Sequence, residues 1–316
     1  MKKFLLKTLL YLSLIFSLFA IIVVITNSGL RKSDFGNLKE WREVLDGEVN
    51  ADVLINGSSR AWVQYNPAII DSLLSTNSYN MGMDGAPFDI QYLKFKAYLE
   101  NNKAPKLIIQ NVDLDLLDTE VDFFQKYQFL PFLNNKSFRN LLEKQNLISF
   151  TDLYFPFMRY LGQPKALQIG FSEYFGISHY KSEKFKGFAA CSDLWDESKF
   201  EQRKSLGKIN WTVSPKTKDL FQHFIDECEE KDIKLVLVFA PIYSELTDYI
   251  VDFESSKQLF SSLAKENEIV FLDYSLCEIS DDKNNFYNAT HLNAKGSALF
   301  SVKLCEDLKE MGVLQN

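Results

Sequence analysis

Short apolar runs alternate with amphipathic stretches along most of the chain after residue 50. A short apolar run bounded by turn residues is typical of a buried strand, and we expect strands at 53–55, 106–110, 235–239 and 269–273. The stretch 78–87 predicts a further short strand that runs into a glycine-containing turn. Hydrophobic residues at helical spacing predict helices between the strands, at 67–74, 90–99, 215–231, 253–266 and, last, 294–311. Strands that alternate with helices predict a mostly parallel sheet with helices on its faces, a three-layer α/β/α fold.

Some parts of the chain break this alternation. Residues 117–213 are rich in Phe, Tyr and Lys, have weak periodicity and contain turn signals such as Leu161-Gly162-Gln163-Pro164. We predict a mostly helical and irregular insertion there rather than a second independent domain. Residues 28–50 are interpreted as a polar stalk that leads into a short helix around 38–45. The domain that holds the sheet then spans 51–316.

The first 27 residues predict a cytoplasmic tail followed by a transmembrane anchor. The run from Thr8 to Thr26 contains no charged residue, and at about 1.5 Å per residue it spans roughly the hydrocarbon core of a bilayer. A cleaved signal peptide is the alternative, and cleavage near residue 27 would give a secreted, soluble protein. The run is longer than the roughly 7–15 apolar residues of a signal peptide, however, and no Ala-x-Ala follows it.

The lysines on one side of this run outnumber the basic residues just after it, which orients the anchor. A positive excess marks the cytoplasmic side, so the amino terminus is expected inside and the body outside the cytoplasm. The residues concerned are Lys2, Lys3 and Lys7 before the run, and Arg31 and Lys32 after it.

Composition and charge narrow the possible partners. The chain of 316 residues is 46% hydrophobic and has a net charge of −7. Because the first 26 residues carry only positive charges, the remainder is more acidic still, which argues against nucleic acid as a partner. The cysteines Cys191, Cys228, Cys277 and Cys305 are widely spaced and form no metal-binding pattern. Disulfides and buried free thiols both remain open for them.

The first candidate for chemistry is the turn Gly57-Ser58-Ser59, which follows the strand at 53–55. Parallel sheets present polar residues at the carboxyl ends of their strands. The serines of such a turn commonly cap the next helix, and a nucleophilic serine is the competing interpretation. A serine hydroxyl needs a base within hydrogen-bond reach before it becomes a nucleophile at neutral pH.

His291 is the histidine best placed to be that base. His179 lies in the insertion and His223 in the middle of a predicted helix, whereas His291 lies in the turn before the last helix. A base also needs an acceptor that holds its other ring nitrogen. Asn288 lies three residues earlier and can serve through its side-chain carbonyl, although an amide lacks the charge that stabilises an imidazolium. A carboxylate, Asp281 or Asp282, is the alternative orienting group.

Taken together, these turns resemble the SGNH (GDSL-like) hydrolase superfamily over residues 50–115 and 214–312. Gly57-Ser58-Ser59 looks like the Gly-Asp-Ser block, with Ser59 at the nucleophile position and Ser58 in place of Asp. The sequence 80–85, Asn-Met-Gly-Met-Asp-Gly, resembles the Asn-x-Gly-x-x-Gly block. The family's oxyanion hole takes a backbone N–H from the last glycine of this block, which corresponds to Gly85. Asn288-Ala289-Thr290-His291 is similar to the Asp-x-x-His block.

The chain departs from the family pattern at two positions. The family's third block carries an Asn whose side chain donates to the oxyanion, and the spacing places Asp113 there. An ionised Asp cannot donate a hydrogen bond, and Asn111 would share a face with Asp113 if the strand continues. Asn288 stands where the family has Asp. Loss of one oxyanion donor can cost on the order of 10²–10³ in rate.

The resemblance implies a flavodoxin-like sheet and a serine acyl hydrolase or acyltransferase that needs no metal or cofactor. Ser59 would be the nucleophile, His291 the base and Asn288 its orienting group. The backbone of Ser59 and Gly85, with Asn111 or Asp113, would form the oxyanion hole. The closest resemblance is to membrane-anchored bacterial members that act on envelope polymers beside a membrane-bound O-acyltransferase. An acylated glycan or similar polymer is therefore the expected substrate, and a non-catalytic envelope component is the alternative.

Overall fold

The computed structural model describes residues 1–118, 126–155, 158–177 and 179–314. The chain forms two compact units. The amino-terminal unit consists of Met1–Glu48 and Phe124–Ser182, and the sheet unit consists of Val49–Phe123 and Glu183–Asn316. The stretch 117–213, predicted as one insertion, is thus shared between both units, and its residues 119–125, 156–157 and 178 lie outside the described part.

The centre of the sheet unit is a parallel sheet of five strands with the order β2-β1-β3-β4-β5. Every neighbouring pair is parallel, and Ile55 in the centre of β1 pairs with Asn80 on one side and Ile109 on the other. This order is that of flavodoxin-like sheets, so the predicted α/β fold is confirmed. The strands are β1 (Val53–Asn56), β2 (Ser78–Asn80), β3 (Leu107–Asn111), β4 (Lys234–Phe239) and β5 (Val270–Asp273).

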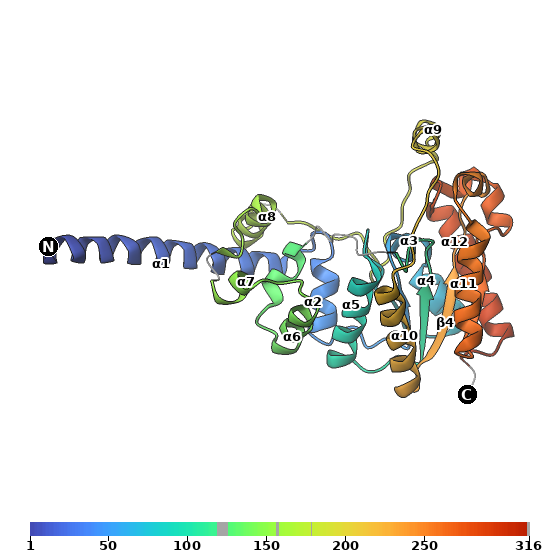
Figure 1. Ribbon diagram of the computed structural model, residues 1–316, viewed down its shortest axis with the longest axis horizontal. Helices are drawn as coiled ribbons and strands as arrows, with labels where there is room; N and C mark the ends of the chain where they lie inside the picture. The colour runs from blue at the N-terminus through green and yellow to red at the C-terminus, as the bar shows by residue number, and fades with distance from the viewer. Residues whose placement is uncertain (119–125, 156–157, 178, 315–316) are drawn as a thin grey trace. The chain divides into compact units, whose positions relative to one another are not determined.

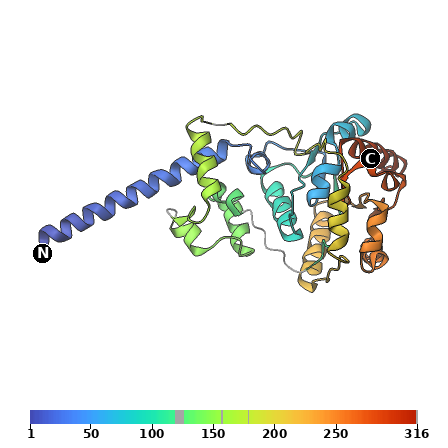
Figure 2. The same cartoon turned by 90° about the horizontal axis from the view of Figure 1, so that it is seen from above.

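Helices cover both faces of this sheet. On one face, Phe221 packs against Phe88 and Phe260, which brings together three helices: α5 (Phe88–Asn101), α10 (Pro215–Glu230) and α11 (Phe253–Glu266). The other face carries α3 (Ser59–Gln64), α4 (Pro67–Leu74) and α12 (Ala294–Glu310), and α12 contacts both of the others. The view from above shows α4 and α12 on the opposite side of the sheet from α10 and α11 (Figure 2).

The sequence explains where these elements begin and why they are buried. All residues of β1 and β3 are buried, as expected for central strands of a parallel sheet whose two faces are covered. The Ser214 side chain accepts a hydrogen bond from the N–H of Thr217, and Pro215 occupies the first turn of α10. This serine cap followed by proline is the predicted helix start.

Short elements complete the sheet unit. A hairpin of two antiparallel strands, β6 (Phe286–Asn288) and β7 (His291–Leu292), precedes α12, where the sequence indicated only a turn. The remaining elements are α9 (Glu197–Ser205) and the 3₁₀ helices η4 (Ser244–Tyr249), η5 (Glu278–Asp281) and η6 (Lys283–Asn285). The four cysteines are free thiols, two of them buried.

The amino-terminal unit is helical. Its long helix α1 (Lys2–Lys32) is apolar and long enough to span a membrane, and it continues five residues past the predicted end of the anchor. The helix α8 (Pro164–Tyr174) packs closely on α1 (Figure 1): a Cβ on Gly29 would lie 1.8 Å from the carbonyl oxygen of Gly170. The other elements are α2 (Leu38–Leu45), η1 (Lys126–Gln128), η2 (Leu130–Phe132), α6 (Lys136–Lys144) and α7 (Phe150–Tyr154).

Candidate active site

A sharp strand-to-helix turn presents Ser59 at the carboxyl end of β1. Gly57 has a φ of +152°, and a Cβ there would lie 2.6 Å from the Cβ of Ala61 and 2.9 Å from that of Asn111. Only glycine fits such a backbone and such a close approach. Ser59 is then the first residue of α3, directly after its N-cap residue Ser58.

The loop after β2 is fastened against α3. The Asn80 side-chain amide donates to the carbonyl oxygens of Ala61, at 2.7 Å, and Tyr65, at 3.0 Å. A Cβ on Gly82 would lie 2.3 Å from the backbone nitrogen of Trp62, so this glycine permits the loop to touch the helix. The contacts of Asn80 and Gly82 with α3 therefore hold the segment 80–85 close to the edge of the sheet where Ser59 lies.

His291 meets Ser59 from the opposite end of the chain. Its Nε2 lies 2.7 Å from Ser59 Oγ, although 232 positions separate the two residues in the sequence. The histidine projects from the β6–β7 hairpin, and its ring stacks on Tyr287 with a centroid distance of 5.4 Å. The pair has the contact that a serine nucleophile and its base require.

The other ring nitrogen of His291 has two neighbours. Its Nδ1 lies 2.9 Å from Asn288 Oδ1 and 2.9 Å from Thr290 Oγ1. Asn288 Oδ1 also accepts from the backbone N–H groups of Thr290 and His291, each at 3.0 Å, which holds the amide in place. An Nδ1–H that donates to Asn288 leaves Nε2 free to accept the Ser59 proton. Sequence reasoning missed Thr290, and its only signal was its position next to the histidine.

Burial keeps His291 neutral. It lowers the pKa of His291 to about 4, and the neighbouring positive charge of Arg60 acts in the same direction. His291 forms no hydrogen bond with a carboxylate among the described residues. Asp282 instead accepts from Asn284 and from Lys295, so it does not orient the ring.

Backbone donors remain unused beside Ser59. Within the described residues, neither the N–H of Ser59 nor that of Gly85 has a hydrogen-bond partner. Gly85 has a φ of +61°, and a Cβ on it would meet nothing within 4 Å. Both residues line the same pocket. Such N–H groups are the donors that an oxyanion hole requires.

Asp113 and Asn111 take part in a second network of side-chain hydrogen bonds, which does not include His291. Asp113 accepts hydrogen bonds from the hydroxyl of Ser58, from Arg60 at 3.0 Å and from the Asn111 amide at 2.7 Å. The Asn111 carbonyl in turn accepts from Tyr65 at 2.7 Å. Asn111 is fully buried and does not line the pocket. Sequence reasoning missed Arg60, which directly follows the serines.

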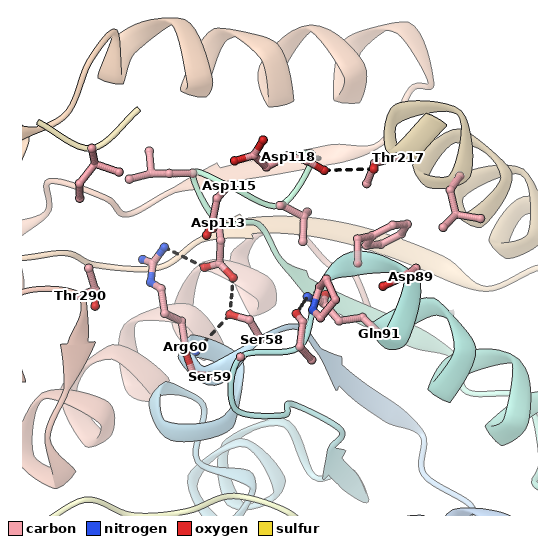
Figure 3. Close-up of a pocket in the computed structure, with 18 of the residues that line it drawn as sticks. Ser58, Ser59, Arg60, Asp89, Gln91, Asp113, Asp115, Asp118, Thr217 and Thr290 are labelled. Carbon is pink, nitrogen blue, oxygen red and sulfur yellow. Dashed lines mark hydrogen bonds and ion pairs between the residues drawn. The ribbon is translucent and has the colours of Figure 1, made fainter. Parts of the chain in front are cut away.

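A pocket of about 370 Å³ opens in front of Ser59 and His291. Figure 3 shows Asp113 pointing toward Ser58 and Arg60 at one side, and Asp118 bonded to Thr217 at another. Burial and the neighbouring charge of Asp113 raise the pKa of Asp115, which also lines the pocket. Most of the remaining wall is apolar, formed by Ala86, Pro87, Phe88, Leu114, Leu116, Ile209, Leu220 and Ile242.

No metal site is present among the described residues: nowhere in them do three His, Cys, Asp or Glu side chains come together in a way that could hold an ion. The polar groups around Ser59 are instead hydroxyls, amides and one ion pair. The chemistry that these side chains offer is proton transfer and nucleophilic attack.

Comparisons with known proteins give little further guidance. No known family model matches the sequence, and no curated protein matches it. Among solved structures, the chain is similar to a Bacteroides fragilis protein described as a candidate acylhydrolase, with 13% identity and a TM-score of 0.40. The match covers 88% of this chain and 94% of that one. A likeness this weak carries no argument about fold or activity.

Proposed function

We propose that the protein is a serine acyl hydrolase or acyltransferase, in which Ser59 is the nucleophile and His291 its base. The observation that carries the proposal is the 2.7 Å contact between Ser59 Oγ and His291 Nε2 at the wall of a pocket. Asn288 orients the base through Nδ1. The free backbone N–H groups of Ser59 and Gly85 are the donors for an oxyanion.

The reaction follows from these positions. Ser59 Oγ attacks the carbonyl carbon of an ester while its proton passes to His291 Nε2, and the carbonyl oxygen becomes an oxyanion held by the two N–H groups. The C–O bond to the leaving alcohol then breaks, and His291 returns the proton to that alcohol. An acyl ester on Ser59 remains. Water or a second hydroxyl then attacks this acyl ester, with His291 again as base. Attack by water gives hydrolysis, and attack by a second hydroxyl gives acyl transfer.

With Asn288 as its partner, His291 accepts a proton less readily than it would beside a carboxylate. The imidazolium that forms during attack is half-buried, lies near Arg60 and faces the neutral amide of Asn288. The positive charge of this imidazolium is partly compensated by the negative charge of the oxyanion, which forms in the same step. We therefore propose a modest intrinsic rate.

The proposed place of action is the outer face of a membrane. The long apolar helix α1 supports an uncleaved anchor, and the basic amino-terminal residues favour a cytoplasmic tail with the body outside. The resemblance of the serine, glycine and histidine turns to envelope-acting SGNH proteins supports an acylated envelope glycan or similar polymer as substrate. A membrane-bound O-acyltransferase is the proposed partner, an analogy between families.

A fluorophosphonate probe tests the nucleophile. Full-length protein in membranes should be labelled at Ser59, and the Ser59→Ala variant should not be labelled. The matched control is Ser58→Ala, because Ser58 is the adjacent serine and bonds to Asp113 instead of His291. We expect this control to keep labelling within a few-fold of the wild type. Labelling that survives Ser59→Ala would contradict the assignment of the nucleophile.

A non-catalytic envelope component is the second candidate. Two observations favour it: Asn288 is uncharged, and the two side chains at the third block, Asn111 and Asp113, bond to each other, with Asn111 outside the pocket. In that case the pocket binds a glycan or docks a partner. The result that selects this candidate is a folded wild-type protein that the probe does not label at any pH between 5 and 9.

A further inference from the structure

The amino-terminal unit exposes a group of large apolar side chains on α7 and on the segment between α7 and α8. We call it the apolar edge: Phe150, Tyr154, Phe155, Met158 and Leu161, with exposed fractions of 40 to 66%. The Phe150 ring lies 4.5 Å from that of Tyr154 and 6.0 Å from that of Phe155, centroid to centroid. Soluble proteins rarely leave a large group of apolar side chains in water, so we expect a partner that covers the apolar edge.

The position of the apolar edge along α1 identifies that partner. Tyr160 donates its hydroxyl proton to the Asn27 side chain, and Asn27 directly follows the uncharged run that ends at Thr26. A Cβ on Gly170 would lie 2.7 Å from the carbonyl oxygen of Thr26, so α8 touches α1 at this same level. In both views α7 and α8 lie nearer the amino-terminal part of α1 than α2 and α6 do (Figures 1 and 2).

The charges of this segment fit a lipid surface. Residues 150–161 contain one acid, Asp152, which is buried, accepts a hydrogen bond from the backbone N–H of the N-cap residue Ser149 and pairs with Lys126. Their one base, Arg159, donates to the backbone carbonyl of Asp152 at 2.9 Å. The apolar edge therefore presents no unpaired acid to anionic headgroups. Aromatic side chains at this depth are typical of the interfacial belts of membrane proteins.

We propose that the apolar edge inserts into the headgroup region of the bilayer that α1 spans. This rests on the anchor in the proposed function and not on its chemistry. A single helix leaves the body free to tilt about its exit point. A second contact beside that point holds the amino-terminal unit against the membrane surface at a defined depth.

Spin labels in the full-length protein, reconstituted in phospholipid nanodiscs, test this. The background carries Cys191→Ser and Cys277→Ser, since Cys228 and Cys305 are buried and should not react. A label at Leu161→Cys should be accessible to oxygen, which dissolves in lipid. Its accessibility to a water-soluble nickel chelate should be several-fold lower than that of a control label at Lys144→Cys, on α6. Leu161 is largely exposed, so the substitution should not disturb folding.

A third label, at Leu14→Cys on α1, separates failure of the proposal from failure of the anchor. If the Leu14 label lies in lipid and the Leu161 label matches the Lys144 label, the apolar edge stays in water and the proposal is overturned while the anchor stands. Exclusion of both reagents at Leu161 would mean contact with protein, which also overturns it. A Leu14 label open to the nickel chelate would overturn the anchor itself.

Discussion

Two neighbouring groups of side chains at the carboxyl edge of the sheet behave differently. The relay consists of Ser59, His291 and Asn288, and the ion-pair cluster consists of Ser58, Arg60, Asp113 and Asn111. They start from consecutive residues of one turn. The relay has an open side toward the pocket, with two backbone N–H groups that lack partners. In the ion-pair cluster Asp113 accepts from the other three members, although Ser58, Arg60 and Asp113 also line the pocket.

The comparison shows how one turn divides structural and chemical roles. Ser58 is the N-cap residue of α3 and has an extended backbone, whereas Ser59 is the first helical residue, and the two side chains contact different partners. Ser58 caps α3 and binds Asp113, whereas Ser59 reaches His291. The ion-pair cluster gives rigidity beneath the turn, and the relay carries the reactive hydroxyl. The next three predictions test this division, from the largest expected effect to the smallest.

Removing the base should affect only the relay. His291→Ala should reduce the rate of fluorophosphonate labelling at Ser59 by about 10³-fold or more, as for other serine–histidine pairs, with little change in melting temperature. His223→Ala is the matched control, because His223 is exposed on α10, and it should label normally. Equal labelling rates for both variants would mean that the 2.7 Å contact has no role in activating Ser59.

Removing the carboxylate should affect mainly the ion-pair cluster. Asp113→Asn leaves the buried Arg60 guanidinium without its partner, and both side chains are only 7% exposed. Removal of one partner from a buried pair costs about 3–5 kcal/mol, so urea unfolding followed by tryptophan fluorescence should show a loss of that order.

The double variant Arg60→Gln with Asp113→Asn separates the ion pair from a general packing defect. It should recover part of the lost stability, because no unpaired charge then remains buried. A double variant that is as unstable as the sum of the two single variants would show that the pair is not coupled.

Charging the orienting residue should strengthen the relay. Asn288→Asp places a carboxylate 2.9 Å from Nδ1, which stabilises the imidazolium and raises the pKa of His291 above about 4. Attack requires neutral His291, so the wild-type labelling rate should fall only below about pH 4, and this limb should move to higher pH in the variant. At pH 8 the variant should label about tenfold faster, because the carboxylate stabilises the imidazolium that forms during attack.

The control for this variant is Asn210→Asp, which adds the same charge at an exposed position and should leave the profile unchanged. An unchanged acid limb in Asn288→Asp would show that Asn288 does not govern the proton affinity of His291.

The strands and helices of the sheet unit were largely predictable, because each depends on a local pattern. The helices at 67–74 and 253–266 have the predicted bounds, and the strand at 106–110 is displaced by one residue. The β6–β7 hairpin was not predicted, since two strands of three and two residues are too short to show a period. The grouping of 124–182 with 1–48 was not predicted either. It depends on close glycine contacts between distant helices.

For the site, the sequence alone determined which turns follow the strands and which residue types they carry: a serine pair, a glycine-containing block and a histidine. Those follow from hydrophobic periodicity and turn residues, which act over a few positions. The resemblance of these turns to a known family predicted Ser59, His291 and Asn288 as partners. Only the tertiary structure shows their contacts, and it alone shows that Asp113 pairs with Arg60. The contacts of Ser59 with His291 and of Arg60 with Asp113 join residues 232 and 53 positions apart, a separation that no local pattern spans.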